Sequence, residues 1–113
     1  MLKSPILKEV KMYNKKIYSV EEIKNKIKEN EKFLKEKYFV GSFFLFGSYA
    51  RGKQTQTSDI DLLVDFQKVI DMFEMVDLQN YLQKLFGKKV DLGTKKGLKN
   101  FIKDTILKEA IAL

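Results

Sequence analysis

The hydrophobic positions of the chain first follow a helical period. Ser19 stands three residues before Glu22, which is the capping-box spacing at a helix start. Apolar residues then recur at helical intervals as far as Tyr38. This pattern predicts an amphipathic helix from about residue 20 to 37, preceded by an arm, residues 1–18, with no clear period.

Two more helices are predicted from apolar residues spaced mostly by three or four positions. One covers about 70–86 and ends at Gly87, because glycine readily adopts the left-handed conformation that closes a helix. Its apolar positions are Ile70, Phe73, Val76, Leu78, Tyr81, Leu82 and Leu85. The other covers about 97–110, with apolar positions Leu98, Phe101, Ile102, Ile106 and Leu107.

Between these helices, three short segments are predicted to be strands. The apolar run SFFLF, residues 42–46, stops at Gly47, and one helical turn from Ser48 to Arg51 and a polar loop follow it. Residues 59–66 alternate in character, with Ile60, Leu62, Val64 and Phe66 on one face and Asp59, Asp61, Leu63 and Asp65 on the other. In the third segment, 89–93, Asp91 faces the same way as these acids.

The topology follows from where the polar residues must meet. If Gly47 is to approach Asp61, the first two strands run antiparallel, whereas the long helical crossover before Asp91 allows a parallel return. We therefore expect an α/β (α+β) fold with a mixed sheet of three to four strands flanked by helices. At 113 residues the chain is expected to form one domain, with a core over 19–113.

Composition narrows the chemistry. The chain has no Cys and no His, which excludes a disulfide framework and the Ser-His and Cys-His hydrolases, and favours a hard cation such as Mg²⁺ held by oxygen ligands. No apolar run is long enough to span a bilayer, and the first residues are too rich in lysine for a signal peptide. We expect a cytoplasmic protein that does not associate with membranes.

The formal net charge of +7 raises the alternative of a nucleic-acid partner. Among the 22 basic residues, however, only Arg51 is an arginine, and the lysines are dispersed over the whole chain. Most lysines are expected to be solvated helix faces, so we do not expect direct nucleic-acid binding. Arg51 and Lys53 either contact phosphates or only add solubility, whereas Tyr49 is expected to pack rather than stack on a base.

The acids carry the chemical hypothesis. Two carboxylates about 5 Å apart repel by roughly 3 kcal/mol at an effective dielectric near 20, and a divalent cation removes that cost. Asp59 and Asp61 fit the bridging of two metal ions in a phosphoryl displacement, and Asp91 fits a third ligand that helps take a proton. Ser48 and the amides after Gly47 open a helical turn that favours a triphosphate. Asp65 lies farther along the strand and is expected to be structural.

The segment GSYARGKQTQTSDIDLLVDF resembles the polymerase-beta-type nucleotidyltransferase signature, in which Gly-Ser is followed after ten residues by Asp-x-Asp. The similarity continues through KKVDLGTKKGLKNFIKDTILKEAIAL, covers roughly 42–113, and is closest to the minimal nucleotidyltransferases that include MntA-like antitoxins. The resemblance implies triphosphate binding by Gly47 and Ser48, metal binding and catalysis by Asp59 and Asp61, and a third acid at Asp91. Asn100 and Gly93 depart from the family's usual Pro and Val.

The resemblance also implies a function. Members of this group pair with a HEPN-family RNase toxin and silence it by transferring AMP from ATP to a tyrosine. The alternatives are an antitoxin that acts by occlusion alone, and an RNA-tailing or nucleic-acid-binding protein. Three mutually repelling acids argue against occlusion alone, and the scarcity of arginine argues against nucleic-acid binding.

Overall fold

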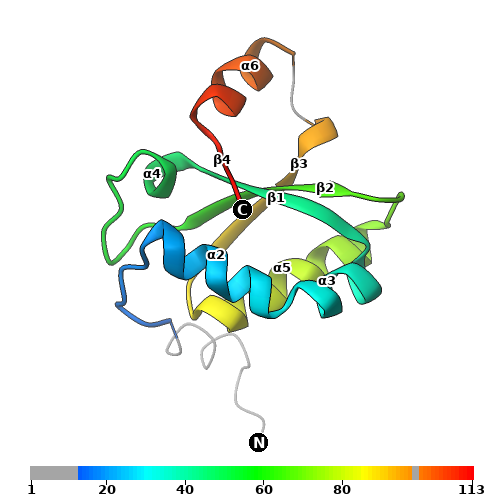
Figure 1. The fold of residues 1–113 in the computed structure, drawn as a ribbon, viewed down its shortest axis with the longest axis horizontal. Coiled ribbons are helices and arrows are strands. Elements are labelled where there is room, and N and C mark those ends of the chain that lie inside the picture. The colour runs from blue at the N-terminus through cyan, green and yellow to red at the C-terminus, as the bar shows by residue number, and fades with distance from the viewer. Residues whose placement is uncertain (1–12, 98–99) are drawn as a thin grey trace, which may run out of the picture.

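The computed structural model describes residues 13–97 and 100–113. The predicted helices and strands follow one another in the expected order, with a break in the first helix and a short strand added at the end (Figure 1). In chain order they are α2 (Val20–Glu29), α3 (Glu31–Tyr38), β1 (Val40–Phe46), α4 (Gly47–Ala50), β2 (Ile60–Phe66), α5 (Met72–Phe86), β3 (Val90–Thr94), the 3₁₀ turn η1 (Lys95–Gly97), α6 (Asn100–Glu109) and β4 (Ile111–Ala112).

The capping box at the first predicted helix is confirmed. The Glu22 amide donates to Ser19 Oγ at 3.1 Å, and the Ser19 amide donates to Glu22 Oε1 at 3.0 Å. The helix itself is not continuous, because Asn30 ends α2 and precedes α3 with a non-helical backbone, φ −110° and ψ 11°. The Asn30 side chain donates to the Lys26 carbonyl at 2.8 Å and accepts from the Tyr81 hydroxyl at 2.8 Å. These two bonds hold the break in place.

The long helix α5 begins and ends where local chemistry dictates. Asp71 caps its start in a second capping box, and Gly87, at φ 62°, ends it in the left-handed conformation. Leu78, Leu82 and Phe86 are its fully buried apolar residues. Phe73 and Val76, which the apolar period places with these, are instead 85% and 48% exposed. They are exposed because they lie on the side of α5 that faces away from the buried residues.

The sheet has the order β3-β2-β1-β4. β1 pairs antiparallel with β2, and β2 pairs parallel with β3 across the α5 crossover, so the predicted mixed topology is confirmed. β4 adds two residues at the edge, antiparallel to β1, and the Leu113 amide donates to the Phe43 carbonyl at 3.0 Å. The sequence pattern does not mark this short strand, in which Ile111 is half-buried and Ala112 is exposed.

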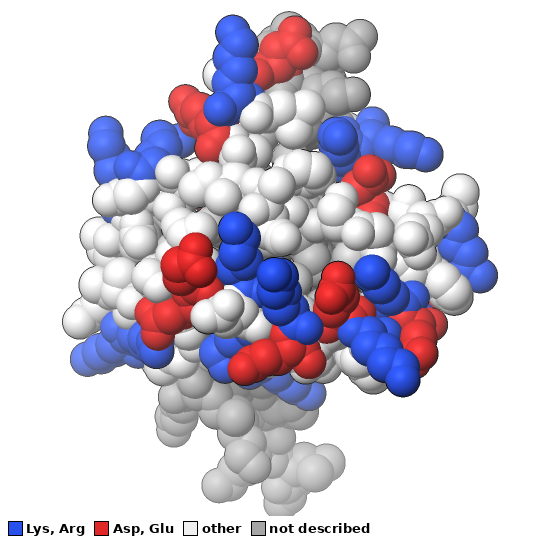
Figure 2. Space-filling view, in the orientation of Figure 1, with Lys and Arg blue, Asp and Glu red and all other residues white. Residues whose placement is uncertain are grey.

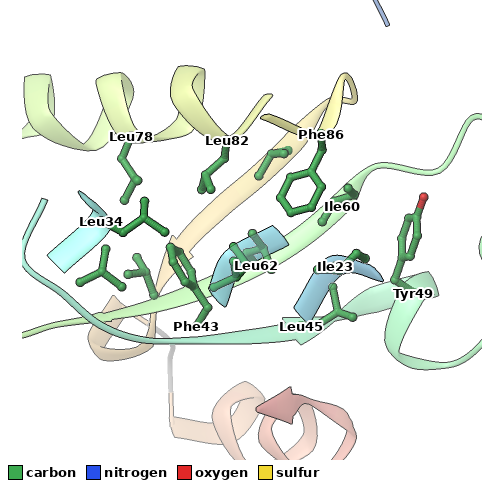
Figure 3. Close-up of a cluster of buried hydrophobic side chains, with 14 of the residues drawn as sticks. Ile23, Leu34, Phe43, Leu45, Tyr49, Ile60, Leu62, Leu78, Leu82 and Phe86 are labelled. Carbon is green, nitrogen blue, oxygen red and sulfur yellow. The ribbon is translucent and has the colours of Figure 1, made fainter. Parts of the chain in front are cut away.

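The helices lie on both sides of the sheet (Figure 1). Helices α2, α3 and α5 cover one side, and α6 lies on the other. The main core fills the space between the sheet and helices α2, α3 and α5 (Figure 3). Its largest fully buried side chains are Tyr49, Phe86, Ile23, Leu34, Leu45, Ile60, Leu62, Leu78 and Leu82. Burial of Tyr49 confirms the prediction that this ring packs.

The two faces of β2 differ as its sequence alternation predicts. Ile60, Leu62 and Val64 are completely buried on the side of the main core. Asp61 and Asp65 alternate with them and are only partly buried. The alternation therefore places the acids on the sheet face away from α5.

Parts of the predictions fall outside the described residues. These are residues 1–12 of the arm, and the side chains of Leu98, Phe101 and Ile102 in the closing helix. Ile106 and Leu107 of α6 are half-buried. Among the residues that the structure describes, no helix has the length and apolar character needed to cross a bilayer.

Candidate functional site

The chain reaches the site through a sharp turn at Gly47. This residue follows β1 directly and begins the four-residue helix α4 with φ at 72°, a conformation that strains L residues. A Cβ added to Gly47 would collide with Asp61 Oδ2. The carboxylate of Asp61 therefore lies against the Gly47 backbone, and the two halves of the sequence motif meet as predicted.

The strand register brings the second acid beside the first. Phe46, the residue before Gly47, pairs with Asp61 across the antiparallel β1–β2 ladder. Asp61 pairs in turn with Asp91 across the parallel β2–β3 ladder. Since paired residues point to the same face of a sheet, both carboxylates stand on the side away from the main core. Asp61 is half-buried and Asp91 is exposed.

The electrostatics of Asp61 reflect this crowding. Burial raises the pKa of Asp61 most, and the Asp91 carboxylate raises it further by repulsion and by a hydrogen bond, to about 6. Asp59 adds a smaller repulsion, and the Arg51 guanidinium acts in the opposite direction. The site therefore holds more negative charge than its own basic side chains neutralise.

Asp59 stands slightly apart from this pair. Its Oδ2 lies 3.7 Å from the Nζ of Lys89, and both side chains are partly exposed. The Ile60 amide donates to the Lys89 carbonyl at 2.9 Å, which fixes the two segments side by side. An exposed ion pair of this kind contributes about 0 to 1 kcal/mol, so Asp59 can exchange Lys89 for another cation at little cost.

A divalent cation fits these residues by their chemistry. Carboxylate oxygens are the ligands that Mg²⁺ prefers, and the repulsion that raises the pKa of Asp61 is the kind that a cation relieves. Within residues 13–97 and 100–113, no three acids stand close enough together to enclose a metal ion as they are. The carboxylates of Asp59, Asp61 and Asp91 remain the predicted ligands, with Asp59 turned toward Lys89.

The predicted triphosphate contacts lie at the same turn. Arg51 follows α4, and its Nη1 is 3.5 Å from Oε2 of Glu109 at the end of α6. Both side chains are about half exposed, so the guanidinium is open to solvent beside the acids. The Ser48 carbonyl accepts from the Lys53 amide at 2.9 Å, which closes the loop after α4. Phosphate binding by Gly47, Ser48 and Arg51 stays a prediction.

Lys89 and Glu109 also belong to the site, although sequence reasoning did not single them out. Each pairs with a predicted site residue, Asp59 or Arg51, across elements that are distant in sequence. In a chain with many charged residues, the neighbouring sequence does not indicate which distant residue a given lysine or glutamate will pair with. Asp65, on the same face as Asp61, pairs with Ser42 near the other end of the β1–β2 ladder, away from the turn at Gly47.

Sequence and structural comparisons agree with this geometry. Residues 20–113 match the nucleotidyltransferase domain family. A Methanocaldococcus jannaschii protein named putative protein adenylyltransferase is 45% identical over 94 residues, which cover 82% of this chain and 96% of that protein. The protein adenylyltransferase MntA of Thermococcus cleftensis is 38% identical over 93 residues, which cover 82% of this chain and 94% of that protein. A crystal structure of a toxin-antitoxin with AMP-PNP matches with a TM-score of 0.65 at 26% identity, over 78% of this chain and 69% of that one.

The matched span contains Gly47, Asp61 and Asp91 together with the whole sheet that brings them into contact. The family assignment thus rests both on the motif and on the fold that assembles it. This chain belongs to the nucleotidyltransferase domain family and is an enzyme of that kind.

Proposed function

We propose that the chain is an antitoxin that transfers AMP from ATP to a hydroxyl of a partner protein, most simply a tyrosine of a HEPN-family RNase toxin. The observation that carries the proposal is that the Asp61 carboxylate lies against the Gly47 turn, with Asp91 paired beside it on β3. The similarity to MntA and to a toxin-antitoxin with AMP-PNP supports both the donor and the kind of partner.

The reaction is an in-line displacement at the α-phosphorus of ATP. The acceptor oxygen forms a new bond to phosphorus, the bond to the oxygen bridging the α- and β-phosphates breaks, and pyrophosphate leaves. Mg²⁺, when bound by Asp59, Asp61 and Asp91, supplies charge neutralisation at the attacking and leaving oxygens. Arg51 and the amides that follow Gly47 face the triphosphate in this arrangement.

The acceptor must lose its proton as the new bond forms. Asp91 is the exposed member of the acid pair, so it is the carboxylate that an incoming hydroxyl can reach. A phenol, with a pKa near 10, gives up this proton more easily than an aliphatic hydroxyl does.

The exposure of the acids also favours a protein acceptor. A cavity of about 480 Å³ lies at the other end of β2, where Val64, Phe66 and Met75 contribute to its lining, and none of the three predicted metal ligands lines it. A side chain presented by a partner protein suits an open edge of this kind. An added adenylyl group would bring negative charge to the partner and would repel RNA phosphates near an RNase site.

The proposal is tested by incubating the purified chain and its partner with ATP and Mg²⁺. Intact mass and peptide sequencing should locate an added adenylyl group on a partner tyrosine, with one pyrophosphate released for each group transferred. The Asp59→Asn and Asp61→Asn chains should leave the partner unmodified.

Asp65→Asn is the matched control, because it removes one carboxylate from the same strand and face about 13 Å beyond Asp61. This variant should transfer AMP at the wild-type rate. An unmodified but silenced partner in the presence of the wild-type chain would refute the proposal and establish inhibition by occlusion.

A further inference from the structure

The first described residues form an extended segment that fastens to the end of α5. This strap, residues 13–18, precedes the span that matches the family. The Asn14 amide donates to the Gly87 carbonyl at 2.8 Å, and Asn14 Nδ2 donates to the Phe86 carbonyl at 3.1 Å. The Tyr18 hydroxyl donates to the same Phe86 carbonyl at 2.7 Å and is buried. Three hydrogen bonds thus fix the strap to one turn of backbone.

Lys88, which follows that turn, is buried in an unusual way. Only 3% of this lysine is exposed, and among the described residues it has no acidic partner within ion-pair distance. Its Nζ donates instead to two backbone carbonyls, that of Asn14 at 3.0 Å and that of Gln56 at 2.9 Å. Burial lowers the pKa of Lys88, as expected for an ammonium removed from water. The two backbone carbonyls therefore stabilise the buried ammonium group of Lys88.

The second carbonyl belongs to the loop that leads into the site. Residues 52–58 connect α4 to Asp59, and this loop contacts the strap and Lys88 at two points. Gln54 Nε2 donates to the Tyr18 carbonyl at 3.2 Å, and the Gln56 carbonyl accepts from Lys88. Around Gln56, the Thr55 amide donates to Ser58 Oγ at 2.8 Å, which closes a tight turn directly before Asp59.

We propose that Lys88 and the strap position the loop 52–58, and through it Asp59, for nucleotide transfer. The proposal rests on the proposed function, since it assigns a role in that reaction. The Lys88 Nζ bonds to backbone carbonyls and forms no ion pair with a described carboxylate, so it is a positioning residue rather than a catalytic one. A lysine is suited to the task because a single Nζ can donate to two carbonyls from segments 42 residues apart in sequence.

The test compares Lys88→Met with Lys84→Met in the full chain. Methionine keeps an unbranched side chain and removes the donor, whereas Lys84 is an exposed lysine of α5 and controls for the lost charge. Rates are measured well below each variant's melting temperature and divided by the folded fraction. Lys88→Met is expected to lower kcat by about tenfold or more, because small displacements of positioning groups slow transfer strongly. Lys84→Met should keep the wild-type kcat.

Hydrogen exchange gives a readout that does not depend on activity. Amides of residues 53–58 should exchange at least about tenfold faster in Lys88→Met than in the wild type, and Lys88→Arg, which keeps the donors, should restore much of the protection and of kcat. Gln54→Met removes the hydrogen bond from Gln54 to the Tyr18 carbonyl without altering Lys88. It should also speed exchange of this loop, so the proposal stays testable if Lys88→Met does not fold.

The outcomes separate the two proposals. Unchanged exchange in the loop, or an unchanged kcat per folded molecule, would overturn the positioning role. A wild-type chain that transfers no AMP would refute the proposed function, while the exchange experiment would still decide whether Lys88 and the strap hold the loop.

Discussion

Replacing Asp61 by asparagine should stabilise the metal-free fold although it removes a proposed metal ligand and catalytic residue. In the folded chain the pKa of Asp61 is raised from 3.8 to about 6, first by burial and then by Asp91. The folded state therefore binds this proton more tightly than the unfolded state does, and ionisation of Asp61 destabilises the fold. Asparagine keeps the shape of the side chain and cannot ionise.

The size of the effect follows from the pKa shift. Each pKa unit corresponds to about 1.4 kcal/mol, so the full shift would amount to about 3 kcal/mol. Because Asp61 is only half-buried, solvent screening reduces this, and we expect about 1 to 1.5 kcal/mol at neutral pH. The penalty is absent below the unfolded pKa of 3.8, grows as the pH rises to about 6, and is complete above that.

The assay is urea unfolding of both chains in the presence of a chelator, from about pH 3.5 to about pH 8. The stability difference between Asp61→Asn and the wild type should rise over the interval between the two pKa values and then stay constant. Asp65→Asn controls for the loss of one negative charge from the same face. A difference independent of pH, or a less stable asparagine variant at neutral pH, would refute the reasoning.

Three more predictions follow from individual contacts. Gly47 and Gly52 both have positive φ, but a methyl group added at Gly47 would collide with Asp61, whereas Gly52 has open space. Gly47→Ala should therefore cost more stability than Gly52→Ala and should abolish transfer, and urea unfolding of the two variants checks the difference in stability. Tyr38 donates to Asp77 Oδ2 at 2.8 Å, and burial, reinforced by Asp77, raises its pKa to about 12. Wild-type stability should therefore fall between about pH 10 and about pH 12, where the Tyr38→Phe chain loses less, as alkaline unfolding would measure. Mg²⁺ should raise the melting temperature of the wild type but not of Asp61→Asn, and equal shifts in calorimetry would contradict the metal assignment.

Much of the site could be predicted because its residues are fixed by local rules. The two-residue alternation of β2 sets Asp61 on the face opposite Ile60 and Leu62, and this alternation survives in the fold because a slip of one residue would bury the acids. The turn at Gly47 must meet that face, which in turn requires an antiparallel partner strand. The parallel return of Asp91 follows from the length of the crossover.

The features that escaped prediction depend on contacts across the fold. Lys88 stands in a Lys-Lys pair that looks like surface, and only the backbone carbonyls of distant segments make its burial possible. Asn30 interrupts a helical period that continues on both sides of it, held by a bond from Tyr81. Phe73 lies about 140° around α5 from Leu78 at 100° per residue, so spacing by three or four residues does not by itself assign a residue to the buried stripe.

The charges visible on the surface are of both signs. Figure 2 shows basic and acidic side chains interspersed on the face that carries α2 and α3, rather than a continuous basic surface. Contacts such as that between Lys35 Nζ and Glu31 Oε1, at 3.4 Å, contribute to this mixture. The lysines of α3 are exposed to solvent, as their dispersion in the sequence predicts.

The mixed sheet also determines the order in which the site can assemble during folding. Phe46 and Asp61 are 15 positions apart and pair across a loop, whereas Asp61 and Asp91 are 30 positions apart and pair only after α5 has crossed over. The closer pair has the smaller closure entropy, so we expect the β1–β2 hairpin to form before β3 docks. Repulsion between the two acids then arises only when β3 docks, so it slows that step and not the formation of the hairpin.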